Sequence, residues 1–119
     1  MAPSEFITNA LRTESNKNPI LMHPLSYADD IKINRLLHAA MGLTTEANEF
    51  LDPIKKHLFY GKELDLVNLK EELGDMLWYM AIAFDALDSS FEEEFIRVIK
   101  KLKARYLSLI HISEPTRPY

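Results

Sequence analysis

The segment from Thr44 to Met80 constrains the fold more than any other part of the chain, because two apolar helical patterns meet in it across one short turn. Apolar residues recur at intervals of three and four from Ile33 to Ile54, and again from Leu66 to Leu87. This period is typical of helices that bury one face. Gly61 lies between the two patterns and suits the left-handed backbone at a helix end. The segment therefore predicts an antiparallel helical hairpin.

The rest of the sequence predicts two further helices and no strands. One runs from Ser4, as its N-cap, to about Arg12, and the other begins at Ser89 or Ser90 and ends near Arg105. A chain of 119 residues with 47% hydrophobic residues and only three glycines suits one helical domain. We therefore expect an all-α, antiparallel bundle of about four helices.

Three regions are less regular than these patterns. We expect Ser26 to be the N-cap of the helix that starts at Tyr27. Pro53 either kinks this helix or begins a new one after Asp52. We expect residues 1–106 to form the domain. Residues 107–119 would be a tail, which is either non-native or an ordinary frayed terminus.

Composition and missing motifs exclude several classes of protein. The absence of cysteine excludes disulfides, thiolate zinc sites and a cysteine nucleophile. A net charge of −4 argues against a broad nucleic-acid surface. No glycine-rich phosphate loop and no Glu-x-x-His di-iron motif is present. Because the sequence lacks a signal peptide and a membrane-spanning apolar run, we expect a cytoplasmic protein that does not bind membranes.

Two pairs of carboxylates interrupt the apolar patterns of the hairpin. Glu46 and Glu49 are three residues apart, as are Glu72 and Asp75, and residues at this spacing share a helix face. Each pair lies about eight residues from the turn, so both are at a height of roughly 12 Å along their helices. The sequence therefore predicts that the four carboxylates face one another between the two helices.

Four carboxylates in such a space would repel one another and would be costly to remove from water. Divalent cations would neutralise them, and ligation by oxygen alone favours Mg²⁺, with Mn²⁺ as the alternative. Mg²⁺ commonly bridges to the phosphates of a substrate. The pattern therefore predicts a metal site that binds a phosphate-containing ligand.

A family resemblance rests on the stretch from Thr45 to Leu87, which reads TEANEFLDPIKKHLFYGKELDLVNLKEELGDMLWYMAIAFDAL. It resembles the MazG-like family of all-α nucleoside triphosphate pyrophosphohydrolases, which is marked by ExxE, a spacer and ExxD. The two carboxylate pairs match these motifs with 22 residues between them. The flanking LLHAAMGL, IKKHLFYGK and KLKARY are similar to phage and bacterial single-domain members, and the likeness covers about Glu5 to Tyr106.

The resemblance implies hydrolysis of a (deoxy)nucleoside triphosphate to the monophosphate and diphosphate. It implies Mg²⁺ held by Glu46, Glu49, Glu72 and Asp75, and a homodimer or homotetramer in which neighbouring subunits complete the site. A bound metal makes water nucleophilic near neutral pH, and a carboxylate takes the proton of that water. We expect Glu46 to be this base, with Glu49 as the alternative.

Other residues are candidates for binding the substrate. Lysines near the turn and in KLKARY suit a triphosphate, and an amide and an indole suit a nucleobase; these residues are Lys56, Lys101, Lys103, Asn34 and Trp78. Two departures from the family stand out. Asn48 replaces a small residue that is often glycine, and SLIHISEPTRPY replaces a segment that often carries Asn and Arg near the substrate.

Two alternatives to this function stay open. The same fold serves phosphoribosyl-ATP and dUTP or dCTP pyrophosphatases, and a panel of nucleotides would separate these activities. A non-catalytic helical protein that binds metal or a partner is the third hypothesis. It would fold and bind Mg²⁺ but release no diphosphate from any nucleotide.

Overall fold

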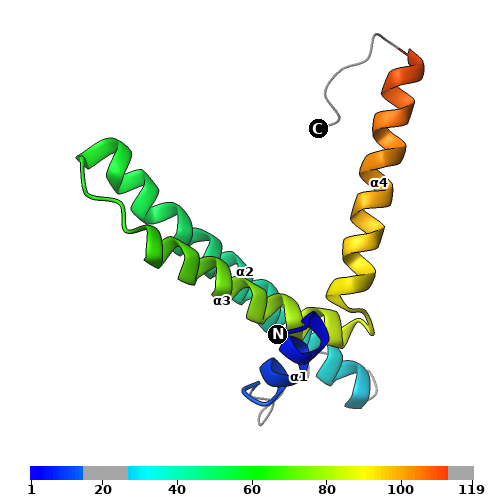
Figure 1. Cartoon of the computed structure of the whole chain (residues 1–119). Helices are drawn as coiled ribbons and strands as arrows, with labels where there is room; N and C mark the ends of the chain where they lie inside the picture. Colours follow the sequence, from blue (N-terminus) through cyan, green and yellow to red (C-terminus); the bar gives the residue numbers. More distant parts are fainter. Residues whose placement is uncertain (15–26, 113–119) are drawn as a thin grey trace.

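The computed structural model describes residues 1–14 and 27–112 and has four helices in this part of the chain. They are α1 (Pro3–Leu11), α2 (Tyr27–Tyr60), α3 (Leu66–Ala86) and α4 (Phe91–Ile112). The predicted all-α fold is therefore confirmed (Figure 1). No helix among the described residues is long and apolar enough to cross a membrane.

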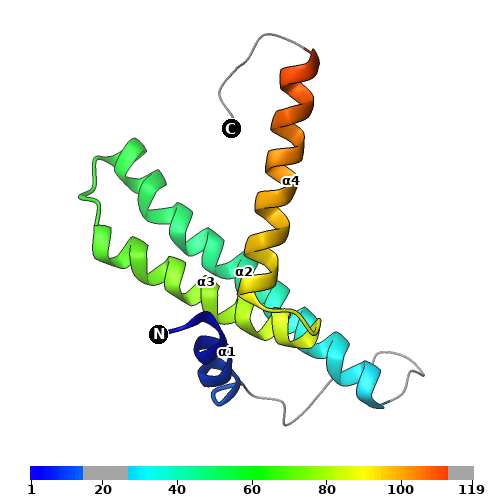
Figure 2. The same ribbon diagram turned by 45° about the vertical axis from the view of Figure 1, so that its right-hand side comes forward.

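The helices α2 and α3 form the predicted antiparallel hairpin (Figure 2). Gly61 has a φ of 65°, as expected for the left-handed residue that ends α2. The ring of His57 donates from Nδ1 to the Lys62 carbonyl at 2.7 Å, which closes the turn, and Asp65 caps α3 by accepting from the Asn68 amide at 3.1 Å. Pro53 neither ends α2 nor restarts it, because α2 is one helix of 34 residues.

Two predicted helix ends differ from the structure. The N-cap of α1 is Ala2 and not Ser4, because Pro3 takes the first helical position, which needs no amide donor. The helix α4 continues to Ile112 and does not end near Arg105, because the apolar spacing continues through Tyr106 and Leu109. The Ser90 hydroxyl accepts from the Glu93 amide at 3.1 Å, as a cap does. The predicted cap Ser26 lies outside the described residues.

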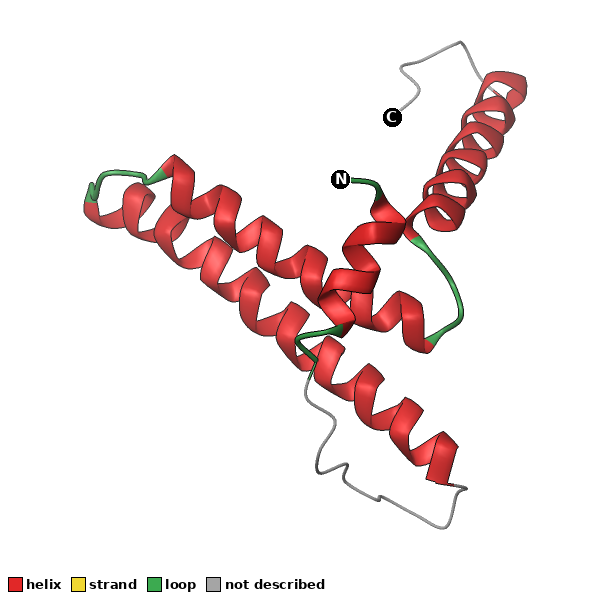
Figure 3. Cartoon of the chain, turned by 60° about the horizontal axis from the view of Figure 1, so that its bottom comes forward, coloured by secondary structure: helices red, strands yellow, loops and turns green. Residues whose placement is uncertain are grey.

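The buried core is small and lies where α1, the middle of α2, the end of α3 and the start of α4 meet (Figure 3). Three of its buried residues are alanines, which let the helices approach closely; the buried residues are Ala10, Ala39, Ala81, Ile82 and Phe91. Phe91 packs edge-on against Phe84, with ring centroids 4.7 Å apart. This core anchors α1 across the hairpin.

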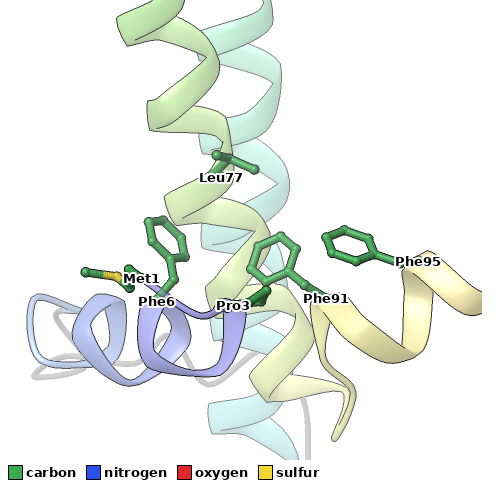
Figure 4. A pocket seen from close by; sticks show the side chains of 6 residues that line it. All are labelled: Met1, Pro3, Phe6, Leu77, Phe91 and Phe95. Atoms are coloured by element: carbon green, nitrogen blue, oxygen red, sulfur yellow. The ribbon is translucent and has the colours of Figure 1, made fainter.

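Beyond this core, α4 points away from the α2–α3 hairpin, so the chain has a V shape (Figure 1). The radius of gyration is 18.8 Å, against about 13.5 Å for a compact domain of this length. An apolar pocket lies at the base of the V, where Leu77 of α3 and Phe91 and Phe95 of α4 point towards one another (Figure 4). Large apolar side chains continue along both arms, and Leu66, Leu73 and Ile99 are each about half exposed or more.

Candidate metal and nucleotide site

Three carboxylates of the hairpin converge midway along it. Glu46 comes from α2, and Glu72 and Asp75 come from α3. One oxygen atom from each lies within 4.8 Å of the other two. The antiparallel pairing of α2 and α3 brings these residues to one level, as the equal distances from the turn predict.

The electrostatics of Glu46 reflect this crowding. Its pKa rises from the ordinary 4.5 to about 7, first because Glu46 shares a side-chain hydrogen bond with Glu72 and then because it is removed from water. The negative charges of Glu49, Asp75 and Glu72 raise the pKa of Glu46 further. The cluster therefore holds a proton at a pH at which an isolated glutamate would have lost it.

Two oxygens of this cluster have no partner within the described part of the chain. The Oε2 atoms of Glu46 and Glu72 are buried and accept no hydrogen bond there. An unsatisfied buried carboxylate oxygen is destabilising, and a cation is the partner that a cluster of acceptors lacks. Three carboxylates with two orphaned oxygens therefore fit a hard divalent cation such as Mg²⁺ or Mn²⁺.

The fourth predicted ligand, Glu49, is placed differently. It lies one turn beyond Glu46 on α2 and is exposed. Its carboxylate is not in the group of three, although it is close enough for its charge to raise the pKa of Glu46. Glu49 is therefore at the edge of the cluster and not within it.

A pocket of about 420 Å³ opens beside the carboxylates and is lined by Thr13, Glu46, Asp75, Trp78 and Tyr79. This volume is within the usual range for sites that bind small molecules. Its lining is partly acidic, from Glu46 and Asp75, and partly aromatic, from Trp78 and Tyr79, which are called the aromatic wall. Such a site can hold a metal ion beside a flat ring.

The two aromatic residues of the lining, Trp78 and Tyr79, pack edge to face with each other and with His38. The centroids of Trp78 and Tyr79 are 5.0 Å apart, and those of His38 and Tyr79 are 5.8 Å apart. Gly42 of α2 makes room for this wall, since a Cβ at that position would lie 2.1 Å from Cε1 of Tyr79. The close packing of α2 on α3 therefore determines where the Tyr79 ring lies.

Sequence reasoning missed two residues of this pocket, Thr13 and Tyr79. Tyr79 follows Asp75 by four positions, so it lies on the same helix face, and this spacing could have identified it. Thr13 has no comparable signal, because it is 65 positions from its hydrogen-bond partner Trp78. Only the docking of α1 on α3 brings these two together.

The predicted substrate residues are scattered in the structure. Trp78 lines the pocket. Lys56 is near the turn of the hairpin and pairs with Asp52 at 2.6 Å. Asn34 donates to the Asp30 carbonyl at 2.8 Å and lies about 18 Å along α2 from Glu46. The other two predicted residues, Lys101 and Lys103, are exposed on α4, the arm that points away from the hairpin (Figure 1).

Comparison with known proteins places this arrangement in a family. A family model for the MazG nucleotide pyrophosphohydrolase domain matches residues 36–109, which is more than half of the 119-residue chain. No curated protein and no solved structure matches the chain significantly. The matched range includes both carboxylate pairs and the aromatic wall of the pocket. The chain therefore belongs to the MazG nucleotide pyrophosphohydrolase domain family, and this membership indicates nucleotide pyrophosphohydrolase activity.

Proposed function

We propose that the protein is a Mg²⁺-dependent nucleoside triphosphate pyrophosphohydrolase that converts a (d)NTP and water to the (d)NMP and diphosphate. The observation that carries this proposal is the convergence of Glu46, Glu72 and Asp75 beside an aromatic pocket. A nucleotide has the complementary parts, a polyphosphate that shares a cation with carboxylates and a flat base that packs on aromatic rings. The chain has a net charge of −4 and would repel a polyanion. A bound divalent cation would reduce this repulsion.

Each carboxylate has a role in this proposal. Glu46, Glu72 and Asp75 would hold the divalent ion, which supplies polarisation of the phosphate and acidification of a bound water. Glu49 is outside the group of three, so it is the carboxylate left to accept the proton of the attacking water. The water oxygen bonds to phosphorus at the α–β anhydride, the anhydride bond breaks, and diphosphate leaves with the bonding electrons. This assignment changes the expected base from Glu46 to Glu49.

The experiment that tests the function is diphosphate release from all the standard dNTPs and NTPs with Mg²⁺, comparing the wild type with Glu72→Gln. Turnover should fall at least about 100-fold, or roughly 3 kcal/mol of activation free energy, because a metal ligand is lost. Glu71→Gln is the matched control, since Glu71 is the adjacent residue of α3 and is exposed. If the folded Glu72→Gln variant turned over substrate as fast as the wild type, Glu72 would not be a metal ligand.

The nucleotide panel also distinguishes the proposal from its alternatives. If only dUTP, dCTP or phosphoribosyl-ATP were hydrolysed, the proposed reaction would stand but the range of substrates would be smaller than proposed. Binding of Mg²⁺ with no diphosphate released from any nucleotide would favour a non-catalytic protein. Glu49→Gln separates the two carboxylate roles, because it should reduce turnover while leaving Mg²⁺ affinity nearly unchanged.

Self-association is part of the proposal, and the V shape supports it. The apolar side chains of α4 recur at alternating steps of four and three, as in helices that pack on a partner helix, at Phe95, Ile99, Leu102, Tyr106 and Leu109. Much of this stripe and of the facing arm is exposed in one chain. A second copy that inserted its own helices into the V would cover both arms. In the resulting homodimer or homotetramer, we expect Lys101 and Lys103 of one subunit to approach the metal-site carboxylates of a neighbouring subunit.

A further inference from the structure

The aromatic wall of the pocket depends on the orientation of one ring. Trp78 is in α3, three residues after Asp75, and both side chains line the same pocket. A tryptophan can bind a nucleobase with its ring face or through its Nε1–H donor. Which of these Trp78 can do is determined by its contact with Thr13, a residue that follows α1 and lines the same pocket.

The hydrogen bonds of the Thr13 hydroxyl have only one consistent arrangement. A hydroxyl has one proton to donate, and a carbonyl can only accept, so Oγ1 donates to the Ala10 carbonyl at 2.9 Å. The indole Nε1–H can only donate, so Trp78 donates to the same Oγ1 at 2.7 Å. The hydroxyl therefore connects the indole of α3 to the last turn of α1.

An ion-pair network holds this connection in place. The next residue, Glu14, accepts two hydrogen bonds from Arg35 of α2, at 2.8 and 3.1 Å. Arg35 also donates to Asp85 of α3 at 2.7 Å. The Glu14 side chain is only 6% exposed, and hydrogen-bonded ion pairs of this kind restrict geometry strongly. These ion pairs therefore hold the backbone next to Thr13 against both helices of the hairpin.

We propose that Thr13 is a positioning residue that fixes the Trp78 indole so that its ring face, and not its N–H group, serves the nucleobase of the substrate. The inference rests on the proposed function and extends it to the nucleoside end of the pocket. Because the indole N–H is already donated to Thr13, Trp78 has no hydrogen bond left with which to distinguish bases. Stacking on a ring face tolerates any base, so Trp78 contributes affinity without base preference.

Thr13→Val tests this inference, because valine keeps the shape of threonine and removes the hydroxyl. The probes are the α,β-imido analogues of dATP and dTTP with Mg²⁺, and inorganic triphosphate as a ligand without a base. The chain has one tryptophan, so its fluorescence reports on Trp78 alone. In the wild type, both analogues should quench this fluorescence, and inorganic triphosphate should bind without the same quenching.

In Thr13→Val, the Kd of both analogues should rise by the same factor, about fivefold or more, with reduced quenching. The Kd of inorganic triphosphate should not change, and Thr13→Ser should restore the wild-type values. Thr8→Val is the matched control, because within residues 1–14 and 27–112 the Thr8 hydroxyl bonds to its own helix alone, at the Ser4 carbonyl. Helix content by circular dichroism identifies a variant that has simply unfolded.

The outcomes separate this inference from the proposed function. If the wild type binds neither analogue, both are overturned. If the wild type binds the analogues and Thr13→Val binds them equally well, only the role of Thr13 is overturned. A loss confined to one of the two bases would show that Trp78 reads the base, and an equal loss for inorganic triphosphate would show a general structural defect; either result contradicts the inference.

Discussion

At the scale of single residues, the fold changes the acid–base chemistry of Glu46 strongly. Its pKa is about 7 in the folded, metal-free chain, against an ordinary value of 4.5. Between these two pH values the folded state keeps a proton that the unfolded state has lost. The free energy of unfolding must therefore decrease as pH rises from about 4.5 to about 7.

Glu46→Gln removes this titration while keeping a side chain of similar shape. With a chelator present, the variant should melt at least about 2 °C above the wild type at pH 8, and this advantage should disappear at pH 4.5. Thermal melts followed by circular dichroism at the two pH values measure the difference. Mg²⁺ at pH 8 should stabilise the wild type more than the variant, and a difference in melting temperature that is the same at both pH values would contradict the coupling.

At the scale of secondary-structure elements, the close contact of α2 with α3 decides the shape of the pocket. It is possible because Gly42 has no side chain where the Tyr79 ring crosses α2. The same packing places Ala39 of α2 and Ala81 of α3 in the buried core. Small residues along this contact therefore bring the aromatic wall and the carboxylates to the same side of the hairpin.

Gly42→Ala should destabilise the protein, although alanine is the better helix former by about 0.5–1 kcal/mol. The new Cβ would be 2.1 Å from the Tyr79 ring, and overpacking of this kind costs about 1–3 kcal/mol. Gly74→Ala is the control, because among the described residues a Cβ there meets no atom within 4 Å apart from its chain neighbours and its own helix backbone, so it should be neutral or stabilising. Urea unfolding at one protein concentration compares them, and equal effects of the two substitutions would refute the contact.

At the scale of the whole molecule, the V shape leaves apolar surface that a single chain does not cover. The stripe on α4 includes Phe95 at 53% and Ile99 at 46% exposure, and Leu73 on the facing arm is 48% exposed. A chain of this length buries only a modest share of its surface when it folds alone. A second copy of the chain is the simplest way to bury more of it. In the proposed oligomer, the site and the contacts between subunits would belong to one helical bundle.

Ile99→Glu should shift the protein towards monomer, because it places a charge in the middle of the α4 stripe. Ile96→Glu makes the same chemical change about 100° around the helix from Phe95, so it should have a smaller effect. Sedimentation velocity across a range of concentrations measures both variants. A wild-type protein that stays monomeric at about 100 µM, where an association free energy of only about −5.5 kcal/mol gives substantial dimer, would refute the proposed association.

Much of this molecule could be predicted from local patterns. The hairpin and the left-handed Gly61 follow from apolar period and turn chemistry, which act between near neighbours. The meeting of Glu46 with Glu72 and Asp75 follows as well, because their distances from the turn are equal. The predicted end of α4 near Arg105 was wrong, because the apolar spacing continues through Tyr106 and Leu109.

The sequence by itself determined which segments are helical and at what height along the hairpin each carboxylate lies, because both depend on contacts within a few residues along the chain. Only the tertiary structure decided that Glu49 stays outside the cluster, that Thr13 meets Trp78, and that Arg35 connects α1 to the hairpin. These features depend on how each helix is rotated and docked against the others. That rotation is selected by packing around Gly42 and the alanine core, between residues far apart in the sequence.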